Sequence, residues 1–401
     1  LAIAGPLKGA GVLDFVSAWY LKAAAYLKPL SPRERGWGEG KAPEPLSLRE
    51  RGWGEGQGDS NYQAPSPGAA RHPLPGGEGK GTRCAFVSTN SITQGEQVGV
   101  LWGAMLAAGM RIFFAHRTFQ WNNEARGVAA VHCVIVGFAH GEITPKRLFD
   151  YQDIRGEAHE LAAGNINPYL VDADDVLLPN RRTCLASVPP IVFGSMPNDG
   201  GNLLLSDIEK NELVASEATS AKWIRRFLGA EEFINGSQRW CLWLQEVSPS
   251  ELRAMSLVSE RVAAVRTLRA ASNRPTTRAL AAYPALFGEI RQPVERYILV
   301  PRHSSENRDF IPLGFVDPEI ICGDSNMLVP TNSLSHFGIM QSTMHMAWVR
   351  TVCGRLKSDY RYSAGIVYNN FPWPELTGPA TVGAAPGRDT DAGNQSRPGA
   401  A

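Results

Sequence analysis

The strongest constraint on the fold is a set of apolar segments between residues 84 and 138. Residues 84–88, 111–115 and 129–138 are rich in β-branched and aromatic side chains, which predicts three strands. Residues 97–108 predict a helix between the first two of them. This order is typical of the edge of an α/β sheet, and the last two strands could pair as a long hairpin. We therefore expect an α/β fold.

The segment before these strands divides into two unlike pieces. Residues 12–27 predict a helix, because Leu13, Val16, Tyr20 and Leu27 fall on one face. Residues 29–40 and 45–56 are near-copies, identical at 11 of 12 positions, and the Gly/Pro-rich character continues to residue 81. These repeats carry almost no apolar face that could stack on a neighbour. We expect residues 29–81 to be a disordered insertion without a role.

The remaining chain suggests a second domain. Residues 1–28 and 82–145 are expected to form the first domain, and residues 146–188, which are mixed and more acidic, a linker. Residues 189–374 contain an Arg-rich helix, short strands and an apolar helical stretch, which indicates a mixed α+β domain. Residues 375–401 turn to Gly, Ala, Pro and polar side chains, so this tail is expected to be disordered.

Charge is distributed unevenly along the chain. The net charge is only +1, which argues against a strongly basic nucleic-acid-binding protein. Residues 222–308, however, hold 14 Lys and Arg against 8 Asp and Glu, and 13 of the 14 bases are Arg. The guanidinium group of arginine can form two parallel hydrogen bonds to a phosphate or to the edge of a guanine. A solvated helix face is the alternative, and we favour it for Arg253, Arg261 and Arg266.

Cysteine and histidine usage exclude some classes of site. None of the six Cys is paired as C-x-x-C, which favours buried thiols in a reducing cytoplasm over zinc or disulfides. The eight His show no metal-ligand spacing, so we expect no metal site. The apolar segment 12–27 is too short to cross a membrane, and Asp14 and Lys22 interrupt it. We therefore expect no membrane partner.

Residues 116–123 are the first candidate site, on a long connection between two predicted strands. An enzyme that acts on a DNA base flips it out and holds it between flat side chains. Phe119 and Trp121 supply flat faces, and Asn122 supplies an amide that can bind the edge of a base. Taken alone, the segment also fits a loop whose aromatic side chains fill a core.

Residues 302–308 are the second candidate. Arg302, Ser304, Ser305 and Arg308 lie between two short predicted strands, where such side chains suit contacts to phosphates and base edges. An ordinary polar turn is an equally good interpretation of this segment.

Residues 357–362, followed by residues 368–374, are the third candidate, since alternating basic and aromatic residues can follow a nucleic-acid backbone. Lys357, Arg361 and Tyr362 are its members. The alternative is a capped helix end with aromatic side chains packed beneath it, which we favour for Phe371 and Trp373.

Many segments, in order, resemble one family: the class I S-adenosylmethionine (SAM)-dependent DNA adenine-N6 methyltransferases related to the type IIL, MmeI-like restriction–modification enzymes. The resemblance covers roughly residues 10–28 and 82–375. The segments that carry it include LDFVSAWYLKAA, CAFVSTNSITQGEQVGVLW, FAHRTFQWNNEA, NINPYLVDADDVLLP, RRFLGAEEFINGSQRWCLWL, MHMAWVRTVCGRLKSDYRYS and YNNFPWP.

The resemblance implies the C-terminal part of a Rossmann-like methyltransferase domain, followed by a DNA target-recognition domain. It implies SAM as cofactor and double-stranded DNA as partner. It places the flipped adenine at residues 119–122 and base-specific contacts at residues 302–308 and 324–328, which adds Asp324 and Ser325 to the DNA-binding candidates.

The chain also departs from the family pattern. The Gly-containing SAM loop and the Asn-Pro-Pro-aromatic motif, expected before residue 12, are not found, and Asn167-Pro168-Tyr169 lacks the second Pro. We interpret the chain as truncated at its N-terminus, leave its cofactor-binding residues unassigned, and expect no turnover by it alone. The alternative is a non-catalytic DNA-recognition module of a split or decayed enzyme, with the missing N-terminal half as a separate chain.

Overall fold

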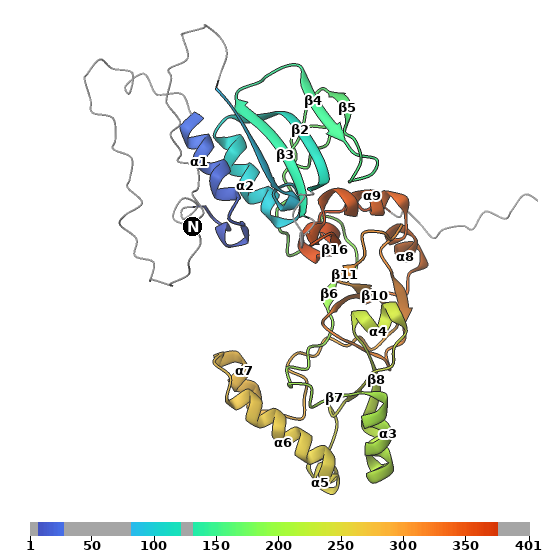
Figure 1. Cartoon of the computed structure of the whole chain (residues 1–401). Coiled ribbons are helices and arrows are strands. Elements are labelled where there is room, and N and C mark those ends of the chain that lie inside the picture. Colours follow the sequence, from blue (N-terminus) through green and yellow to red (C-terminus); the bar gives the residue numbers. More distant parts are fainter. Residues whose placement is uncertain (1–6, 28–81, 122–130, 376–401) are drawn as a thin grey trace, which may run out of the picture.

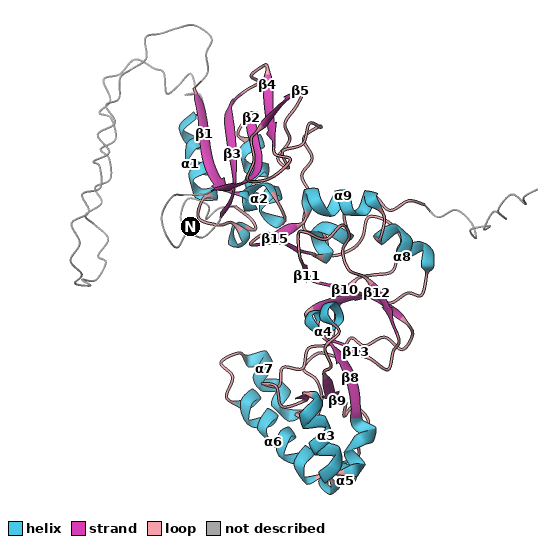
Figure 2. Cartoon of the chain, turned by 45° about the vertical axis from the view of Figure 1, so that its right-hand side comes forward, coloured by secondary structure: helices cyan, strands magenta, loops and turns pink. Residues whose placement is uncertain are grey.

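A computed structural model describes residues 7–27, 82–121 and 131–375 (Figure 1). The expected insertion at 29–81, Asn122, and residues 376–401 of the expected tail lie outside them. The described chain is built on one large sheet at its beginning and on three smaller sheets after it (Figures 1 and 2). None of the helices in these ranges is long and apolar enough to cross a membrane.

The first sheet has five strands in the order β1-β3-β2-β4-β5. Their bounds are β1 (Arg83–Thr89), β2 (Met110–Trp121), β3 (Val131–His140), β4 (Lys146–Asp150) and β5 (His159–Ala163). β3 is antiparallel to both β1 and β2, and β4 is parallel to β2. The strands β1, β2 and β4 therefore run in one direction, so their carboxyl ends share one edge of the sheet.

The sheet confirms the expected strands and the expected pairing of the last two, and corrects two expectations. β2 continues to Trp121 instead of ending at residue 115, so the candidate residues 116–121 lie in a strand and not in a loop. Residues 146–163 form β4 and β5 of the same sheet, so this part of the expected linker belongs to the first domain. The acidic and basic side chains that made the segment look like a linker pair across the strands, as Arg147 does with Glu160.

Two helices, α1 (Ser17–Leu27) and α2 (Glu96–Ala107), pack against this sheet (Figure 2). Tyr20 of α1 is fully buried; its ring stacks on Phe138 and its hydroxyl is 2.9 Å from the hydroxyl of Ser88. Trp102 of α2 is also fully buried and donates to the carbonyl oxygen of Ile92. Both helices are thus anchored by an aromatic side chain that also satisfies its polar atom.

The remainder contains three sheets, in the orders β12-β10-β14-β6, β11-β16-β15 and β13-β8-β9-β7. The strand bounds are β6 (Val192–Phe193), β7 (Leu204–Leu205), β8 (Ile224–Leu228), β9 (Trp240–Leu242), β10 (Tyr297–Pro301), β11 (His303–Ser304), β12 (Gly314–Val316), β13 (Ile321–Cys322), β14 (Asn326–Val329), β15 (Gly354–Leu356) and β16 (Asp359–Arg361). The helices are α3 (Asp207–Ser216), α4 (Ala230–Asn235), α5 (Pro249–Ala254), α6 (Ser256–Ala270), α7 (Pro275–Ala279), α8 (Leu334–Met340) and α9 (Thr343–Val352).

Part of the basic excess in this region is structural. Arg269 of α6 is fully buried, and its guanidinium donates to the carbonyl oxygens of Pro197, Asn198, Leu280, Tyr283 and Leu286 at 2.8–3.2 Å. A buried charge is stable only when it is satisfied in this way. Arg269 therefore joins two loops to α6 and is not available to a ligand.

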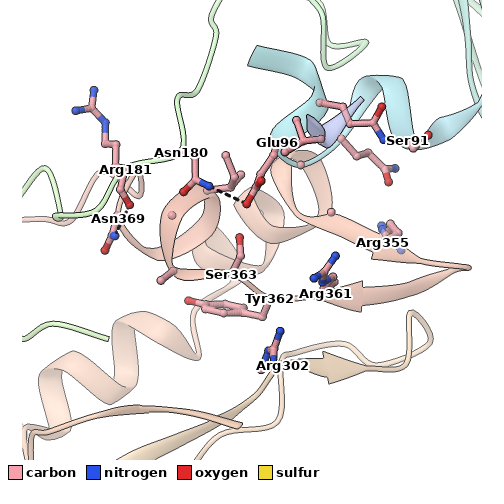
Figure 3. Close-up of a pocket in the computed structure, with 18 of the residues that line it drawn as sticks. Ser91, Glu96, Asn180, Arg181, Arg302, Arg355, Arg361, Tyr362, Ser363 and Asn369 are labelled. Atoms are coloured by element: carbon pink, nitrogen blue, oxygen red, sulfur yellow. Dashed lines mark hydrogen bonds between the residues drawn. The ribbon is translucent and has the colours of Figure 1, made fainter. Parts of the chain in front are cut away.

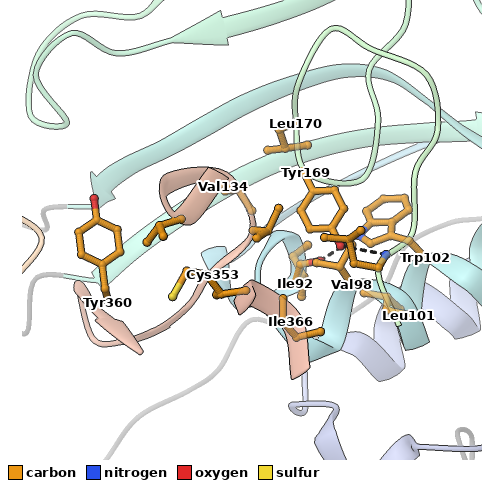
Figure 4. Packing of buried hydrophobic residues seen from close by; sticks show 14 of the residues in the cluster. Ile92, Val98, Leu101, Trp102, Val134, Tyr169, Leu170, Cys353, Tyr360 and Ile366 are labelled. Carbon is orange, nitrogen blue, oxygen red and sulfur yellow. Dashed lines mark hydrogen bonds between the residues drawn. The ribbon is translucent and has the colours of Figure 1, made fainter. Parts of the chain in front are cut away.

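One core joins the first sheet and its helices to the C-terminal segment. Buried side chains of α2 and β3 lie in the same cluster as Cys353, Tyr360 and Ile366 (Figure 4). The backbones approach closely here: the amide of Gly95 donates to the carbonyl of Val352, and a Cβ on Gly95 would lie 3.0 Å from the Cα of Gly354. The relative position of the two parts is therefore set by close packing.

Gly99 and Gly103 of α2 provide a test of this packing. A Cβ on Gly99 would lie 2.9 Å from the carbonyl oxygen of Leu178, whereas one on Gly103 would make an ordinary contact of 3.7 Å with the side chain of Leu177. Alanine is about 1 kcal/mol more favourable than glycine inside a helix. Crowding a backbone atom costs about 1–3 kcal/mol.

We therefore expect Gly103→Ala to raise the free energy of unfolding by up to about 1 kcal/mol. Gly99→Ala should instead lower it by about 1 kcal/mol, because the crowding exceeds the gain in helix propensity. Urea unfolding of the two variants beside the wild type measures both changes. Equal stabilisation by the two alanines would contradict close packing at Gly99.

Candidate nucleic-acid interface

An aromatic cluster lies where β2 and β4 end. It consists of His116, Phe119, Trp121, Phe149 and Tyr151. The rings of Phe119 and Tyr151 are stacked, with centroids 5.3 Å apart and 26° between their planes. Trp121 lies 6.2 Å from Phe119 and is 47% exposed. The cluster thus offers flat faces at the edge of the sheet where the parallel strands end.

His116 holds the cluster together. Its ring is stacked on Phe149 at 4.2 Å and 7°, and its Nδ1 is 2.8 Å from the hydroxyl of Tyr151. Burial, with a smaller contribution from the charge of Arg147, lowers the pKa of His116, which favours the neutral ring. Phe149 and Tyr151 were not among the expected site residues, because the sequence indicated a linker there.

The backbone of β2 is irregular at this point. Its register with β3 shifts between His116 and Phe119, so the last residues of β2 are displaced relative to its start. The amide of Gln120 donates to the carbonyl of Ile154 at 2.7 Å, and Arg155 donates to the side chain of Gln120. The end of β2 is therefore fixed by the segment that follows β4. Asn122, the third expected base-binding residue, lies outside the described residues.

The second and third candidate segments are brought together by the sheet β11-β16-β15. β11 pairs with β16 so that His303 faces Arg361 and Ser304 faces Tyr360. Arg302 precedes β11, and the carbonyl oxygen of its main chain accepts from the amide of Tyr362 at 2.8 Å. Two segments more than 50 residues apart in the sequence thus form one surface.

This sheet forms one wall of a cavity of about 710 Å³ (Figure 3). The cavity lies between the two parts of the chain, since its opposite wall comes from the residues that follow β1 and begin α2. Its polar lining consists of Asn90, Ser91, Gln94, Glu96, Gln97, Asn180, Arg181, Arg182, Arg302, Arg355, Arg361, Tyr362, Ser363 and Asn369. Five of these side chains are arginines and one is a carboxylate.

The other expected DNA-binding residues take different positions. Arg308 and Lys357 are exposed, and Lys357 lies at the turn between β15 and β16 with φ +58°. Ser305 and Asp324 are half-buried, and the main-chain oxygen of Asp324 accepts from Arg302 at 3.3 Å.

Two of the expected contacts, those of Ser304 and Tyr362, need correction, and the third residue, Ser325, also contacts the main chain. Ser304 is buried, at 5% exposed. Tyr362 is 2% exposed, and its hydroxyl is 3.0 Å from Nε2 of His345, so the hydroxyl is occupied inside the core. The hydroxyl of Ser325 accepts from the amide of Ala230, where α4 begins. Ser304 and Tyr362 are therefore not free to read a base, whereas Ser325 is exposed.

SAM does not fit the residues described at this edge. The sulfonium of SAM is a cation, whereas the cavity is lined by five arginines and one acidic side chain, and that acid, Glu96, already accepts from Asn180 at 2.8 Å. Like charges in a partly buried cavity repel strongly. We therefore assign no residue and no step of catalysis to the cofactor.

Comparison with known proteins identifies the family. Residues 172–375 match the model of the MmeI target recognition domain, and residues 77–150 match that of the MmeI DNA-methyltransferase domain. The chain belongs to the MmeI family of DNA methyltransferases. The methyltransferase match includes β4, in agreement with the place of this strand in the first sheet.

Two relatives support this assignment. The chain is 40% identical to DNA methyltransferase A of Bacillus subtilis (strain 168) over 295 residues, which are 74% of this chain and 33% of the relative. It is 43% identical to the type IIL restriction-modification enzyme MmeI, solved in complex with DNA, with a TM-score of 0.75 over 94% of this chain and 44% of that one. The chain thus spans a third to less than half of the relatives' length.

Two buried histidines lie behind the cavity wall of the recognition domain. His345 is 1% exposed and bound to Tyr362; His336 is 4% exposed, stacked on Trp373, and 2.9 Å from the hydroxyl of Tyr368. Burial lowers the pKa of each to about 4, and Nδ1 of His345 has no hydrogen-bond partner. Both are therefore neutral in the folded chain near pH 7.

This burial predicts a loss of stability in mild acid. The unfolded chain takes up the two protons below pH 6.5, and the folded chain only near pH 4, so stability falls as pH drops from 6.5 towards 4. At one pKa unit per 1.36 kcal/mol, we expect each histidine to contribute a loss of about 2 kcal/mol between pH 7.5 and pH 5.

Urea unfolding at the two pH values measures this loss. The variant His345→Gln should show a smaller pH dependence than the wild type, even if its stability at pH 7.5 is lower. The variant His159→Gln replaces an exposed histidine and serves as the control. An unchanged pH dependence in His345→Gln would rule out this source of acid sensitivity.

Proposed function

We propose that this chain is the base-binding edge and the DNA-recognition domain of a site-specific DNA adenine-N6 methyltransferase of a restriction–modification system. One observation carries the proposal: the aromatic cluster and the arginine-lined cavity lie where the parallel strands of the first sheet end. In α/β sheets this is the edge at which ligands bind. A flipped base and the backbone of its strand require flat faces and guanidinium groups, respectively.

The proposed roles follow from the positions of the side chains. Phe119 and Trp121 stack on the flipped adenine, with Tyr151 supporting the face of Phe119 that is turned away from it. Asn122 lies outside the described residues, and its proposed role, binding the edge of the base, comes from the family resemblance alone. Arg302, Arg308, Asp324, Lys357 and Arg361 read or position the DNA.

Methyl transfer itself is proposed for the whole enzyme and not for these 401 residues alone. Without a group that holds the adenine amino nitrogen towards the methyl donor, both orientation and electrostatic assistance are missing. We expect the purified chain, given labelled SAM and mixed-sequence duplex DNA, to incorporate no more label than a heat-denatured sample. Incorporation that rises with time would contradict this.

A non-catalytic recognition module is the second candidate, completed by a separate chain. The observation that favours it is the outer side of β1, which among the described strands pairs only with β3. Beside it, Val87, Phe15 and Trp19 are 49%, 81% and 51% exposed. An unpaired edge with exposed apolar side chains favours a partner. Label transfer that requires a second chain carrying the Asn-Pro-Pro-aromatic motif would support a split enzyme.

The aromatic cluster can be tested by DNA binding alone. Stacking of a base on an aromatic side chain contributes about 1–3 kcal/mol. We therefore expect Trp121→Ala to weaken binding about tenfold to duplexes that the wild-type chain selects from a random pool. Trp19→Ala removes an equally exposed tryptophan on α1 and is the matched control. Equal affinities of the two variants would exclude Trp121 from the interface.

A further inference from the structure

The cavity between the two domains gathers positive charge with little to balance it. Arg181, Arg182, Arg302, Arg355 and Arg361 all line it. The carboxylate in its lining, Glu96, is bound to Asn180, and Glu306 lies 3.7 Å from Arg355. The side chain of Arg181 points away from the cavity and donates to Asn370 (Figure 3). The positive charges of the other arginines repel each other, and an anion in the cavity removes the repulsion.

Two of the guanidinium groups on the wall formed by the recognition domain, those of Arg302 and Arg355, are held in place. Arg302 lies over the ring of Phe193 at 4.8 Å and donates to the main chain of Asp324. Arg355 lies over the ring of Tyr360 at 4.1 Å and donates to the carbonyl oxygen of Ser358 at 2.8 Å. Its Nε is buried without a hydrogen-bond partner. Planar donors fixed in advance suit the oxygens of a phosphate.

The opposite wall supplies neutral donors from the methyltransferase part. Asn90, Ser91, Gln94 and Gln97 line it, after the end of β1; Ser91 is labelled in Figure 3. Hydroxyl and amide groups of this kind contact phosphate and sugar oxygens without reading sequence. A cavity of about 710 Å³ takes a ligand of drug-like size, which is closer to a nucleotide unit of one strand than to a duplex.

We propose that this cavity is a backbone clamp for one DNA strand, in which Arg302, Arg355 and Arg361 bind phosphate oxygens and both domains enclose the strand. The proposal rests on the proposed function, because it requires that the chain binds DNA. It assigns Arg302 to sequence-independent affinity, whereas the family resemblance implies base reading at this position. The clamp would hold the strand beside the aromatic cluster, at the same edge of the sheet.

The salt dependence of binding distinguishes the two roles. Losing one phosphate contact reduces the slope of log affinity against log salt by about 0.9. We expect Arg302→Gln and Arg361→Gln each to reduce this slope by about one. Each variant should also bind two duplexes of equal length, one selected by the wild type and one unrelated, with affinities that are lower by the same factor. Arg361→Lys should keep the slope, and Arg253→Gln, which changes an exposed arginine on α5, should change neither quantity.

Three results would overturn the clamp. An unchanged slope with a smaller preference for the selected duplex would make these arginines base readers. A mononucleotide that displaces the duplex from the wild type at equal concentration would make the cavity a small-ligand site. A wild type that binds neither duplex would refute the proposed function together with the clamp. Matching urea midpoints for each variant and the wild type establish that a change in slope does not come from unfolding.

Discussion

The close contact between α2 and the segment around Gly354 is the constraint on which the rest of the structure depends. Gly95 and Gly354 allow two backbones from different domains to meet, and a single core continues across them. Because the interior is close-packed, the two domains cannot shift without opening this core. Both walls of the arginine-lined cavity are therefore fixed relative to each other, and the site does not depend on a flexible linker.

The elements that could be predicted from the sequence are those with a clear apolar period. β1, β3 and α2 were recognised because their side chains alternate or repeat in the way that strand and helix require. β4 and β5 were missed because they lie at the side of the sheet, where polar side chains such as Arg147 and Glu160 pair in solvent. The end of β2 was missed because its side chains form a surface cluster and not a core.

The candidate site could be predicted only in part, for a related reason. Phe119, Trp121, Arg302 and Arg361 stand out within their own segments. The roles of His116, Tyr151 and Arg355 could not be predicted, because they depend on contacts with residues far along the chain. Arg355, for example, lies beside Glu306. The burial of polar side chains also cannot be predicted from residue type. Tyr362 and Arg269 are of types common at surfaces, yet the polar atoms of each form hydrogen bonds inside the protein.

The small sheet β11-β16-β15 has one further consequence. Arg302 and Arg361 lie at its base, inside the cavity, whereas Lys357 occupies its outer turn and Arg308 follows β11 on an exposed stretch. Under the proposed function, this sheet would contact the DNA backbone at its base and make its other DNA contacts at its outer turn. If so, substitutions at the outer turn would change one set of DNA contacts and leave the backbone contacts of Arg302 and Arg361 in place, so target preference could change while affinity for DNA is kept.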